Sequence, residues 1–193
     1  MKTDIVLAGV GGQGILSIAS ILGAAALKEG LYLKQAETHG MSQRGGAVVS
    51  HVRISDDEIA SDLIPLGKAE IILSVEPMEA LRYLPFLSEN GYIVTNTTPN
   101  ENIPDYPDLN DILAEIKGQP RFIAIDADAV AKEVGNHRVS NVVMLGAATP
   151  FIHISPEKIE AGIEQIFGRK GDEIVQMNLK AFRAGLKYSM ENK

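Results

Sequence analysis

The sequence predicts an α/β protein with three layers, in which helices cover both faces of a mixed, mainly parallel β-sheet. Short apolar runs with β-branched residues, which are typical of buried strands, alternate along the chain with longer segments of helical periodicity. The first of these strands passes into the first helix through a loop that contains four glycines. This order is typical of folds in which the carboxyl ends of parallel strands carry the binding site.

The glycine-rich loop is the sequence Gly-Val-Gly-Gly-Gln-Gly at residues 9–14, between an expected strand at residues 4–8 and an expected helix at residues 15–27. Glycine adopts positive φ without strain and lets another group approach the backbone closely. A helix that begins at such a loop presents unpaired N–H groups and the positive end of its dipole to an anion. We therefore expect a Rossmann-like first loop, with these candidates for cofactor binding: Gly9, Gly11, Gly12, Gln13 and Gly14.

Two interpretations of this loop stay open. The spacing of Gly9, Gly11 and Gly14 matches the dinucleotide-binding pattern, and Glu37 follows a second apolar stretch, roughly where a ribose-binding acid would lie. The same glycines would also allow a strand and a helix to pack tightly without any ligand. A phosphate-binding P-loop is excluded, because the Gly-Lys-Ser/Thr ending is absent.

Length and composition restrict the classes of function. A chain of 193 residues fits a single domain, residues 1–193, with a full core. With 25 acidic and 18 basic residues the formal net charge is -7, and no dense run of Lys or Arg occurs, so we expect no nucleic-acid partner. The chain has no cysteine, so it has no thiol nucleophile, and any iron–sulfur cluster must belong to a partner.

We expect a cytoplasmic protein without a membrane partner. The start of the chain leads directly into the first strand and lacks the apolar region and cleavage site of a signal peptide. No uninterrupted apolar run approaches the ~20 residues that are needed to span a bilayer.

A polar stretch with a histidine and an arginine follows the expected second strand, residues 31–36. We expect this strand to pair in parallel with the first one, because so short a strand–helix–strand succession implies a crossover. The polar stretch, residues 37–47, then opens from the carboxyl end of the second strand, close to the glycine loop. Its candidate cofactor contacts are Gln43, Arg44, Gly45 and Gly46.

Two side chains of this stretch are also candidates for a catalytic role. Arg44 has a planar guanidinium that could bind a carboxylate or phosphate through two hydrogen bonds, and a salt bridge across a subunit contact would suit it equally. His39 could exchange protons near neutral pH, although a structural histidine with hydrogen bonds is the commoner case.

The rest of the chain completes the sheet and its covering helices. Residues 48–54 alternate between two faces, with a short return at residues 59–65, so we expect an antiparallel hairpin with His51 on a solvated or interface face. Asn141, in a helix of small apolar residues, is either a satisfied core amide or an interface contact. Further strands are expected at residues 69–75, 91–96 and 121–126, and further helices at residues 78–87, 109–116, 127–134, 139–148, 156–167 and 172–190.

Autonomous catalysis has little support in the sequence. A hydrolase needs a nucleophile with a base, yet the four histidines lie in dissimilar contexts and no Gly-x-Ser-x-Gly turn occurs. No pair of histidines has the spacing of helical metal ligands, so we expect no metal site in this chain.

Four motifs, taken together, resemble those of a known family. They are the glycine loop at residues 9–14, Glu-Thr-His-Gly-Met-Ser-Gln-Arg-Gly-Gly at residues 37–46, Ser-Val-Glu-Pro-Met-Glu-Ala at residues 74–80 and Asn-Val-Val-Met-Leu-Gly at residues 141–146. The sequence resembles the γ-type subunits of the 2-oxoacid:ferredoxin oxidoreductases over essentially its whole length. Within that family the likeness is to the indolepyruvate branch, because other γ-type subunits tend to carry a tyrosine-glycine-proline arrangement before the arginine.

The resemblance implies the small subunit of an enzyme that oxidatively decarboxylates arylpyruvates to acyl-CoA and passes electrons to ferredoxin, inactive without its large subunit. Thiamine diphosphate, Mg and iron–sulfur clusters would then lie on the large subunit, and coenzyme A would be a co-substrate that the Arg44 loop supports. The alternatives are a γ subunit for pyruvate or branched-chain oxoacids, a free-standing NAD-dependent oxidoreductase, and a nucleotide-binding module. We also expect that the isolated chain can form a homodimer through an exposed apolar face.

Overall fold

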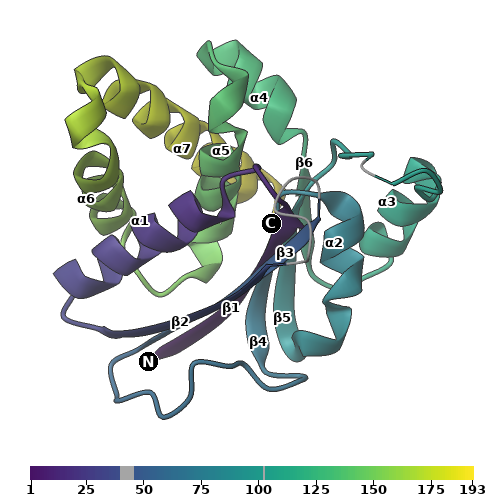
Figure 1. Cartoon of the computed structure of the whole chain (residues 1–193), viewed down its shortest axis with the longest axis horizontal. Helices are drawn as coiled ribbons and strands as arrows, with labels where there is room; N and C mark the ends of the chain where they lie inside the picture. The colour runs from purple at the N-terminus through teal and green to yellow at the C-terminus, as the bar shows by residue number, and fades with distance from the viewer. Residues whose placement is uncertain (40–45, 102) are drawn as a thin grey trace.

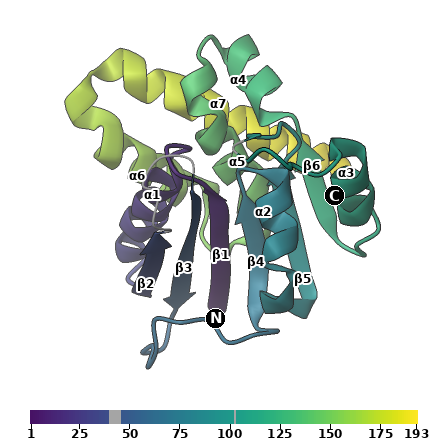
Figure 2. The same ribbon diagram turned by 45° about the vertical axis from the view of Figure 1, so that its right-hand side comes forward.

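The structure, a computed structural model, describes residues 1–39, 46–101 and 103–193, with residue 39 described by its backbone alone. Within these ranges six strands form one sheet: β1 (Lys2–Val10), β2 (Tyr32–His39), β3 (Ala47–Ser55), β4 (Ala69–Ser74), β5 (Leu87–Asn96) and β6 (Phe122–Ile125). Their order is β2-β3-β1-β4-β5-β6, which the turned view of Figure 2 shows more clearly than Figure 1. β3 runs antiparallel to both of its neighbours, whereas β1, β4, β5 and β6 pair in parallel. The sheet is therefore mixed and mainly parallel, as expected.

Helices cover both faces of the sheet, so the fold has the expected three layers (Figures 1 and 2). The smaller layer consists of α2 (Pro77–Arg82) and α3 (Leu109–Lys117), which pack on the face that carries Ile93. The larger layer packs on the face that carries Ile5, Leu7 and Ile71. It consists of α1 (Ile15–Lys28), α4 (Ala127–Val134), α5 (Ser140–Ala148), α6 (Pro156–Phe167) and α7 (Asp172–Asn192).

The strand that carries the glycine loop, β1, has apolar residues on both faces. Ile5 and Leu7 face the larger helical layer, Val6 belongs to a cluster on the opposite face, and all three side chains are fully buried. Apolar residues on both faces are typical of a strand in a sheet that is covered on both sides. The glycine loop therefore leaves the sheet from an interior strand.

The expected parallel pair of β1 and β2 is wrong. Both strands run in the same direction, but β3 lies between them and pairs antiparallel with each. β3 buries Val52 and Ile54, which suits the interior of the sheet. β2 exposes Lys34 and Gln35, and its polar character suits an edge strand.

The expected hairpin between residues 48–54 and 59–65 is also wrong. Residues 56–68 contain no strand, and β3 forms its hairpin with β2. The segment after β3 is held by side chains of the sheet, because the guanidinium of Arg53 donates to the carbonyl of Leu63 at 3.1 Å. A loop, not a strand, thus covers this part of the sheet.

The same loop buries His51, which we expected on a solvated or interface face. Its side chain is 9% exposed and packs edge-on against Phe86, with 5.2 Å between the ring centres. The backbone N–H of Ile64 donates to Nδ1 of His51 at 3.0 Å. The expectation of a solvated face failed because alternation along a strand does not reveal which loop folds over it.

The expected helix at residues 78–87 is shorter than predicted. α2 ends at Arg82, a 3₁₀ turn over Leu84–Phe86 follows, and β5 begins at Leu87. Pro85 lies inside this turn, and proline cannot continue an α-helix because it lacks the amide N–H.

In the part of the chain that the structure describes, no helix is both long enough and apolar enough to cross a bilayer.

Candidate functional site

The glycine loop leaves the carboxyl end of β1 and enters α1, with Gly14 as the N-cap residue. Gly12 and Gly14 have φ values of 101° and 81°, in the region that favours glycine. A Cβ atom on Gly14 would collide with Nδ2 of Asn141, whereas a Cβ atom on Gly12 would meet no atom within 4 Å. Gly14 is therefore packed against α5, and Gly12 faces open space.

The side chain of Gln13 forms hydrogen bonds to the start of the glycine loop and to the segment that follows β4. Its Oε1 accepts a hydrogen bond from the backbone N–H of Val10 at 2.7 Å, and its Nε2 donates to the carbonyl of Val75 at 3.4 Å. Gly9 also packs on Val75, because a Cβ atom at Gly9 would collide with the Val75 side chain. Gln13 and Gly9 thus have a structural role, since they tie the loop to the segment that follows β4.

The described ends of the second predicted stretch lie beside the glycine loop, as expected. The backbone N–H of Gly11 donates to the carbonyl of Gly46 at 2.9 Å. His39 is the last residue of β2 and pairs with Val48 of β3, which places its backbone at the same edge of the sheet. The other predicted contacts lie outside the described residues: the His39 side chain, Gln43, Arg44 and Gly45.

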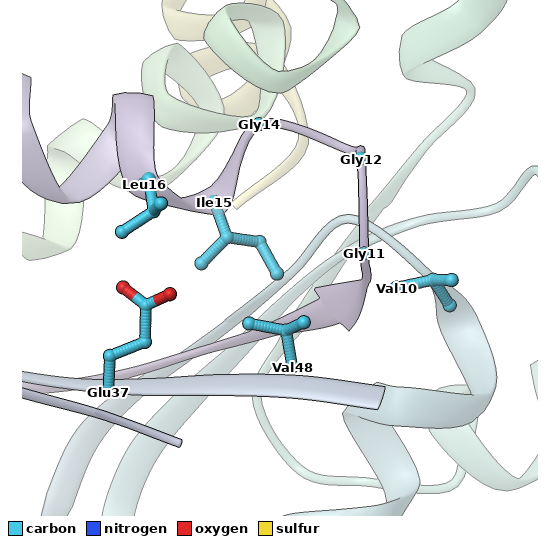
Figure 3. A pocket seen from close by; sticks show the side chains of 8 residues that line it. All are labelled: Val10, Gly11, Gly12, Gly14, Ile15, Leu16, Glu37 and Val48. Atoms are coloured by element: carbon cyan, nitrogen blue, oxygen red, sulfur yellow. The ribbon is translucent and has the colours of Figure 1, made fainter. Parts of the chain in front are cut away.

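A small cavity of about 180 Å³ opens between the glycine loop, the first turn of α1 and β2 (Figure 3). Glu37 of β2 points its carboxylate toward the start of α1. Gln35 donates to this carboxylate from Nε2 at 3.4 Å. An ionised carboxylate only accepts hydrogen bonds, so a ligand here would offer hydroxyl or N–H groups to Glu37. We name this space the Glu37 cavity; its lining is Val10, Gly11, Gly12, Gly14, Ile15, Leu16, Glu37 and Val48.

The strand order differs from that of a dinucleotide-binding unit. In that unit the acidic residue follows the strand next to the first strand. Here Glu37 lies on β2, and β3 separates β2 from β1. Neighbouring strands lie about 4.8 Å apart, which places the backbone of β2 about 10 Å from that of β1. This geometry does not favour the dinucleotide interpretation of the glycine loop.

A second cavity lies at a place that the sequence did not indicate. The connection after β1 leads to the larger helical layer, whereas the connection after β4 leads to the smaller one. Open α/β sheets bind ligands in the crevice at such a switch point, outside the carboxyl ends of the strands. A cavity of about 440 Å³ lies there, and its lining includes Gln13, Asn96, Asp128, His137 and Arg138.

Asn96 is the central polar group of this crevice, and sequence reasoning missed it together with Asp128, His137 and Arg138. Its Nδ2 donates to Asp128 at 2.8 Å, and its Oδ1 accepts from the backbone N–H of Ala127 at 3.0 Å. The end of β5 is thereby joined to the start of α4. Only the order of the strands brings these residues together. Among the described residues, no group of three or more His, Asp or Glu side chains could hold a metal ion.

Comparison with known proteins identifies the family to which this site belongs. Residues 4–188 match the family model described as pyruvate ferredoxin/flavodoxin oxidoreductase. The chain belongs to that family. It is 41% identical to the indolepyruvate oxidoreductase subunit IorB of Pyrococcus horikoshii, over 97% of this chain and 96% of the relative. It is 31% identical to the 2-oxoglutarate synthase subunit KorC of Methanothermobacter marburgensis, over 99% of this chain and 98% of the relative.

Two solved structures have the same fold as this oxidoreductase chain. A keto/oxoacid ferredoxin oxidoreductase γ subunit from Geobacter sulfurreducens has a TM-score of 0.72 at 26% identity, over 98% of this chain and 99% of that subunit. A 2-oxoglutarate:ferredoxin oxidoreductase from Magnetococcus marinus, with 2-oxoglutarate, coenzyme A and succinyl-CoA bound, has a TM-score of 0.79 at 24% identity. That match covers 100% of this chain and 32% of the longer chain. The resemblance to γ-type subunits is thus confirmed.

Two of the motifs that carry the family resemblance have clear structural roles. Glu76 is fully buried, accepts a hydrogen bond from the backbone N–H of Glu79 at 2.9 Å and also accepts one from the hydroxyl of Tyr106. Burial, followed by this hydrogen bond, raises the pKa of Tyr106 above its usual range. Asn141 is a buried amide whose Nδ2 donates to the carbonyl of Gly14 at 3.1 Å. The hydrogen bond and the burial agree with the interpretation of Asn141 as a satisfied core amide.

Proposed function

We propose that this chain is the small, cluster-free subunit of a thiamine-dependent 2-oxoacid:ferredoxin oxidoreductase that acts on indolepyruvate or a related arylpyruvate. In that reaction the oxoacid loses CO₂, its acyl group is transferred to coenzyme A, and the electron pair passes to ferredoxin. The observation that carries the proposal is the identity of 41% to an indolepyruvate oxidoreductase subunit, against 31% to the 2-oxoglutarate subunit.

The large subunit holds the thiamine diphosphate, the Mg and the iron–sulfur clusters. Cysteine thiolates are the usual cluster ligands, and this chain has no cysteine, which supports the assignment. The small subunit, one γ-type domain over residues 1–193, is inactive alone and works in the cytoplasm. Without its partner it forms a homodimer through exposed apolar side chains such as Leu16 (54% exposed) and Leu27 (69% exposed), which light scattering on the isolated chain tests.

Coenzyme A is the co-substrate, and we assign its contact with this chain to the glycine loop and residues 37–46. The Glu37 carboxylate takes hydroxyl or amide donors, which the pantetheine arm of coenzyme A carries. The hydrogen bond of 2.9 Å between Gly11 and Gly46 keeps the two stretches together. Arg44 pairs with a phosphate of the ligand, and His39 is the candidate for proton exchange beside it.

The variant Arg44→Ala tests this role in the complex reconstituted under anaerobic conditions. Loss of a hydrogen-bonded charge pair raises the KM for coenzyme A by about tenfold or more, because such a contact contributes roughly 1.5–3 kcal/mol. The KM for indolepyruvate stays unchanged, and Arg44→Lys recovers part of the loss. Lys187→Ala, which removes an exposed cation on α7, is the matched control. If Arg44→Ala leaves kcat and both KM values unchanged, the role of Arg44 is abandoned.

The substrate class is tested in the same complex. The values of kcat/KM for indolepyruvate and phenylpyruvate are compared with those for pyruvate, 2-oxoisovalerate and 2-oxoglutarate. We expect the two arylpyruvates to be preferred. A preference for pyruvate or 2-oxoisovalerate would move the chain to another branch of the family.

A further inference from the structure

A third cavity lies between the first turn of α1, the start of α5 and the junction of α6 and α7, and its volume is about 340 Å³. We name it the Arg138 cavity. The Glu37 cavity is bounded by β2 and β3, whereas the Arg138 cavity is bounded by helices of the larger layer. The two cavities share only Gly12 and Gly14, so they open on opposite sides of the glycine loop.

The charges that line the Arg138 cavity are of one sign. Arg138 and Lys170 line it, and among the described residues no carboxylate does, in a chain whose formal net charge is -7. Neither cation forms an ion pair with a carboxylate in the described ranges. Asp172 and Glu173 lie in the first turn of α7 without lining the cavity. Arg138 also lines the neighbouring crevice, where Asp128 accepts from Asn96 at 2.8 Å and forms no ion pair with Arg138.

Neighbouring groups hold the backbone of Arg138 and the ammonium of Lys170. Asn136 accepts a hydrogen bond from the backbone N–H of Arg138 at 2.9 Å, which fixes the 3₁₀ turn His137–Val139. The ammonium of Lys170 lies 5.2 Å from the ring centre of Phe167, a residue that also lines the cavity. A cation over an aromatic ring is held there by the charge distribution of the ring. The backbone of Arg138 and the ammonium of Lys170 therefore have defined places at the cavity wall.

Buried amides add hydrogen-bond donors to the same wall. Asn141 is 8% exposed and Asn178 is 4% exposed. Each directs one N–H to a backbone carbonyl, Asn141 to Gly14 at 3.1 Å and Asn178 to Ile174 at 2.7 Å, and these bonds orient the two amides. An amide nitrogen carries two N–H donors, and Ser17 contributes a hydroxyl to the lining. Donors and positive charge together suit an anion with several acceptor oxygens.

We propose that the Arg138 cavity binds a phosphate group between Arg138 and Lys170. A guanidinium matches two phosphate oxygens at once, and an ammonium adds a point charge. The cavity volume of about 340 Å³ lies within the range of roughly 300–1,000 Å³ that is usual for small-molecule sites, so it admits an organic phosphate or a diphosphate. The site goes beyond the proposed function, which places the contact with coenzyme A on the other side of the loop.

Binding of pyrophosphate to the full-length isolated chain, measured by calorimetry at constant ionic strength, tests the proposal. We expect saturable binding at one site, weakened at least about tenfold by Arg138→Ala and by Lys170→Ala, because each removes a charge-assisted contact. Arg138→Lys keeps part of the affinity, and Lys187→Ala, an exposed cation elsewhere, keeps all of it. Arg138 and Lys170 are both exposed, so these variants retain the fold, which circular dichroism verifies.

Absence of saturable binding to the wild-type chain, or equal weakening by Lys187→Ala, would overturn the proposal. The variant Arg44→Ala distinguishes the phosphate site in the Arg138 cavity from the proposed coenzyme A contact at Arg44. The proposal requires that Arg44→Ala leave pyrophosphate binding unchanged, whatever it does to coenzyme A, and a loss as large as that of Arg138→Ala would contradict a separate site. Competition by coenzyme A but not by pantetheine would identify the nucleotide end of coenzyme A as the source of the phosphate. No competition by coenzyme A would identify a separate phosphate ester.

Discussion

Gly14 is constrained twice, by its own backbone and by Asn141. Its φ of 81° lies in the left-handed region, where a side chain is unfavourable. The Asn141 amide donates to its carbonyl and occupies the space that a Cβ atom would need. This pair fixes the start of α1 relative to α5, and with it the wall that the Glu37 and Arg138 cavities share.

The variant Gly14→Ala is therefore expected to destabilise the chain more than Gly12→Ala does. Gly12→Ala costs only the unfavourable φ, about 1–2 kcal/mol, because no atom lies within 4 Å of its Cβ position. Gly14→Ala adds a steric term and costs about 2–4 kcal/mol in total. Urea unfolding of the two variants measures the difference. Equal losses would show that Asn141 does not restrict this position.

A double-mutant cycle assigns the steric term to Asn141. Asn141→Ala alone loses a buried hydrogen bond, but in the Gly14→Ala background it also relieves the clash. The two substitutions in one chain should therefore cost less than the sum of the single losses. Strict additivity would contradict the contact.

At the residue scale, the sequence predicted which side chains lie at the site better than what they do. Gln13 was a candidate cofactor contact at the glycine loop, yet its amide forms hydrogen bonds to the backbone of Val10 and Val75. That choice depends on the end of β4, which is distant in sequence. No local pattern of residues contains this information.

At the element scale, α5 and α7 cross at a pair of glycines. A Cβ atom on Gly146 would collide with the carbonyl of Phe182, and one on Gly185 would collide with the carbonyl of Val143. Small residues let the two helix backbones approach each other closely. The two helices, which form much of the larger layer, depend on this crossing.

Gly146→Ala and Gly185→Ala should each destabilise the chain by about 3 kcal/mol, because the added methyl group forces the helices apart. In an ordinary helix interior the same exchange is stabilising by roughly 0.5–1 kcal/mol, so the sign of the effect is diagnostic. Gly168→Ala is the control, because no atom lies within 4 Å of its Cβ position. Thermal or urea unfolding gives the comparison. A neutral or stabilising Gly185→Ala would contradict the close crossing.

The loop over β3 makes stability depend on pH through His51. Burial, followed by repulsion from Arg53, lowers the pKa of His51 below 6.5, whereas Asp62 and Asp4 act in the opposite direction. The unfolded chain then binds a proton that the folded chain does not, so the free energy of unfolding falls as the pH drops below 6.5. Protonation of Nδ1 would also break the hydrogen bond from Ile64.

Urea unfolding between about pH 7.5 and pH 5.5 measures this effect. His51→Gln should make the free energy of unfolding less dependent on pH in that range, while His153→Gln, which changes an exposed histidine, should leave the dependence as it is. If the free energy of unfolding of His51→Gln depends on pH as strongly as that of the wild type, other groups cause the dependence.

Local signals predicted the elements themselves, whereas pairing between them needed the structure. The helices expected at residues 127–134 and 156–167 have these bounds in the structure, as α4 and α6. Asp126 caps α4 by accepting from the backbone N–H of Ala129. The insertion of β3 between β1 and β2 could not be predicted in the same way. Strand order follows from burial across the whole sheet, and the polar β2 occupies the edge for that reason.

At the scale of the whole molecule, the glycine loop separates the Glu37 cavity from the Arg138 cavity and the adjoining Asn96 crevice, at the carboxyl ends of the parallel strands. The sequence predicted a site between the glycine loop and residues 37–46, because each of these two motifs is a continuous stretch of the chain. The side that contains Asn96 and Arg138 follows from the opposite directions of the connections after β1 and β4. Residues from distant segments meet there, so only the fold identifies them.

The central claim is that this chain is the small subunit of an arylpyruvate:ferredoxin oxidoreductase. Purification of the tagged chain from its native host under anaerobic conditions tests this claim most directly. The co-purifying material is analysed for iron and thiamine diphosphate, and assayed for ferredoxin reduction that requires both indolepyruvate and coenzyme A. We predict a large partner in equal amount, with iron, thiamine diphosphate and this activity, and no activity in the separated small chain. Recovery of the chain alone, without iron or thiamine and with a bound nucleotide, would contradict the account.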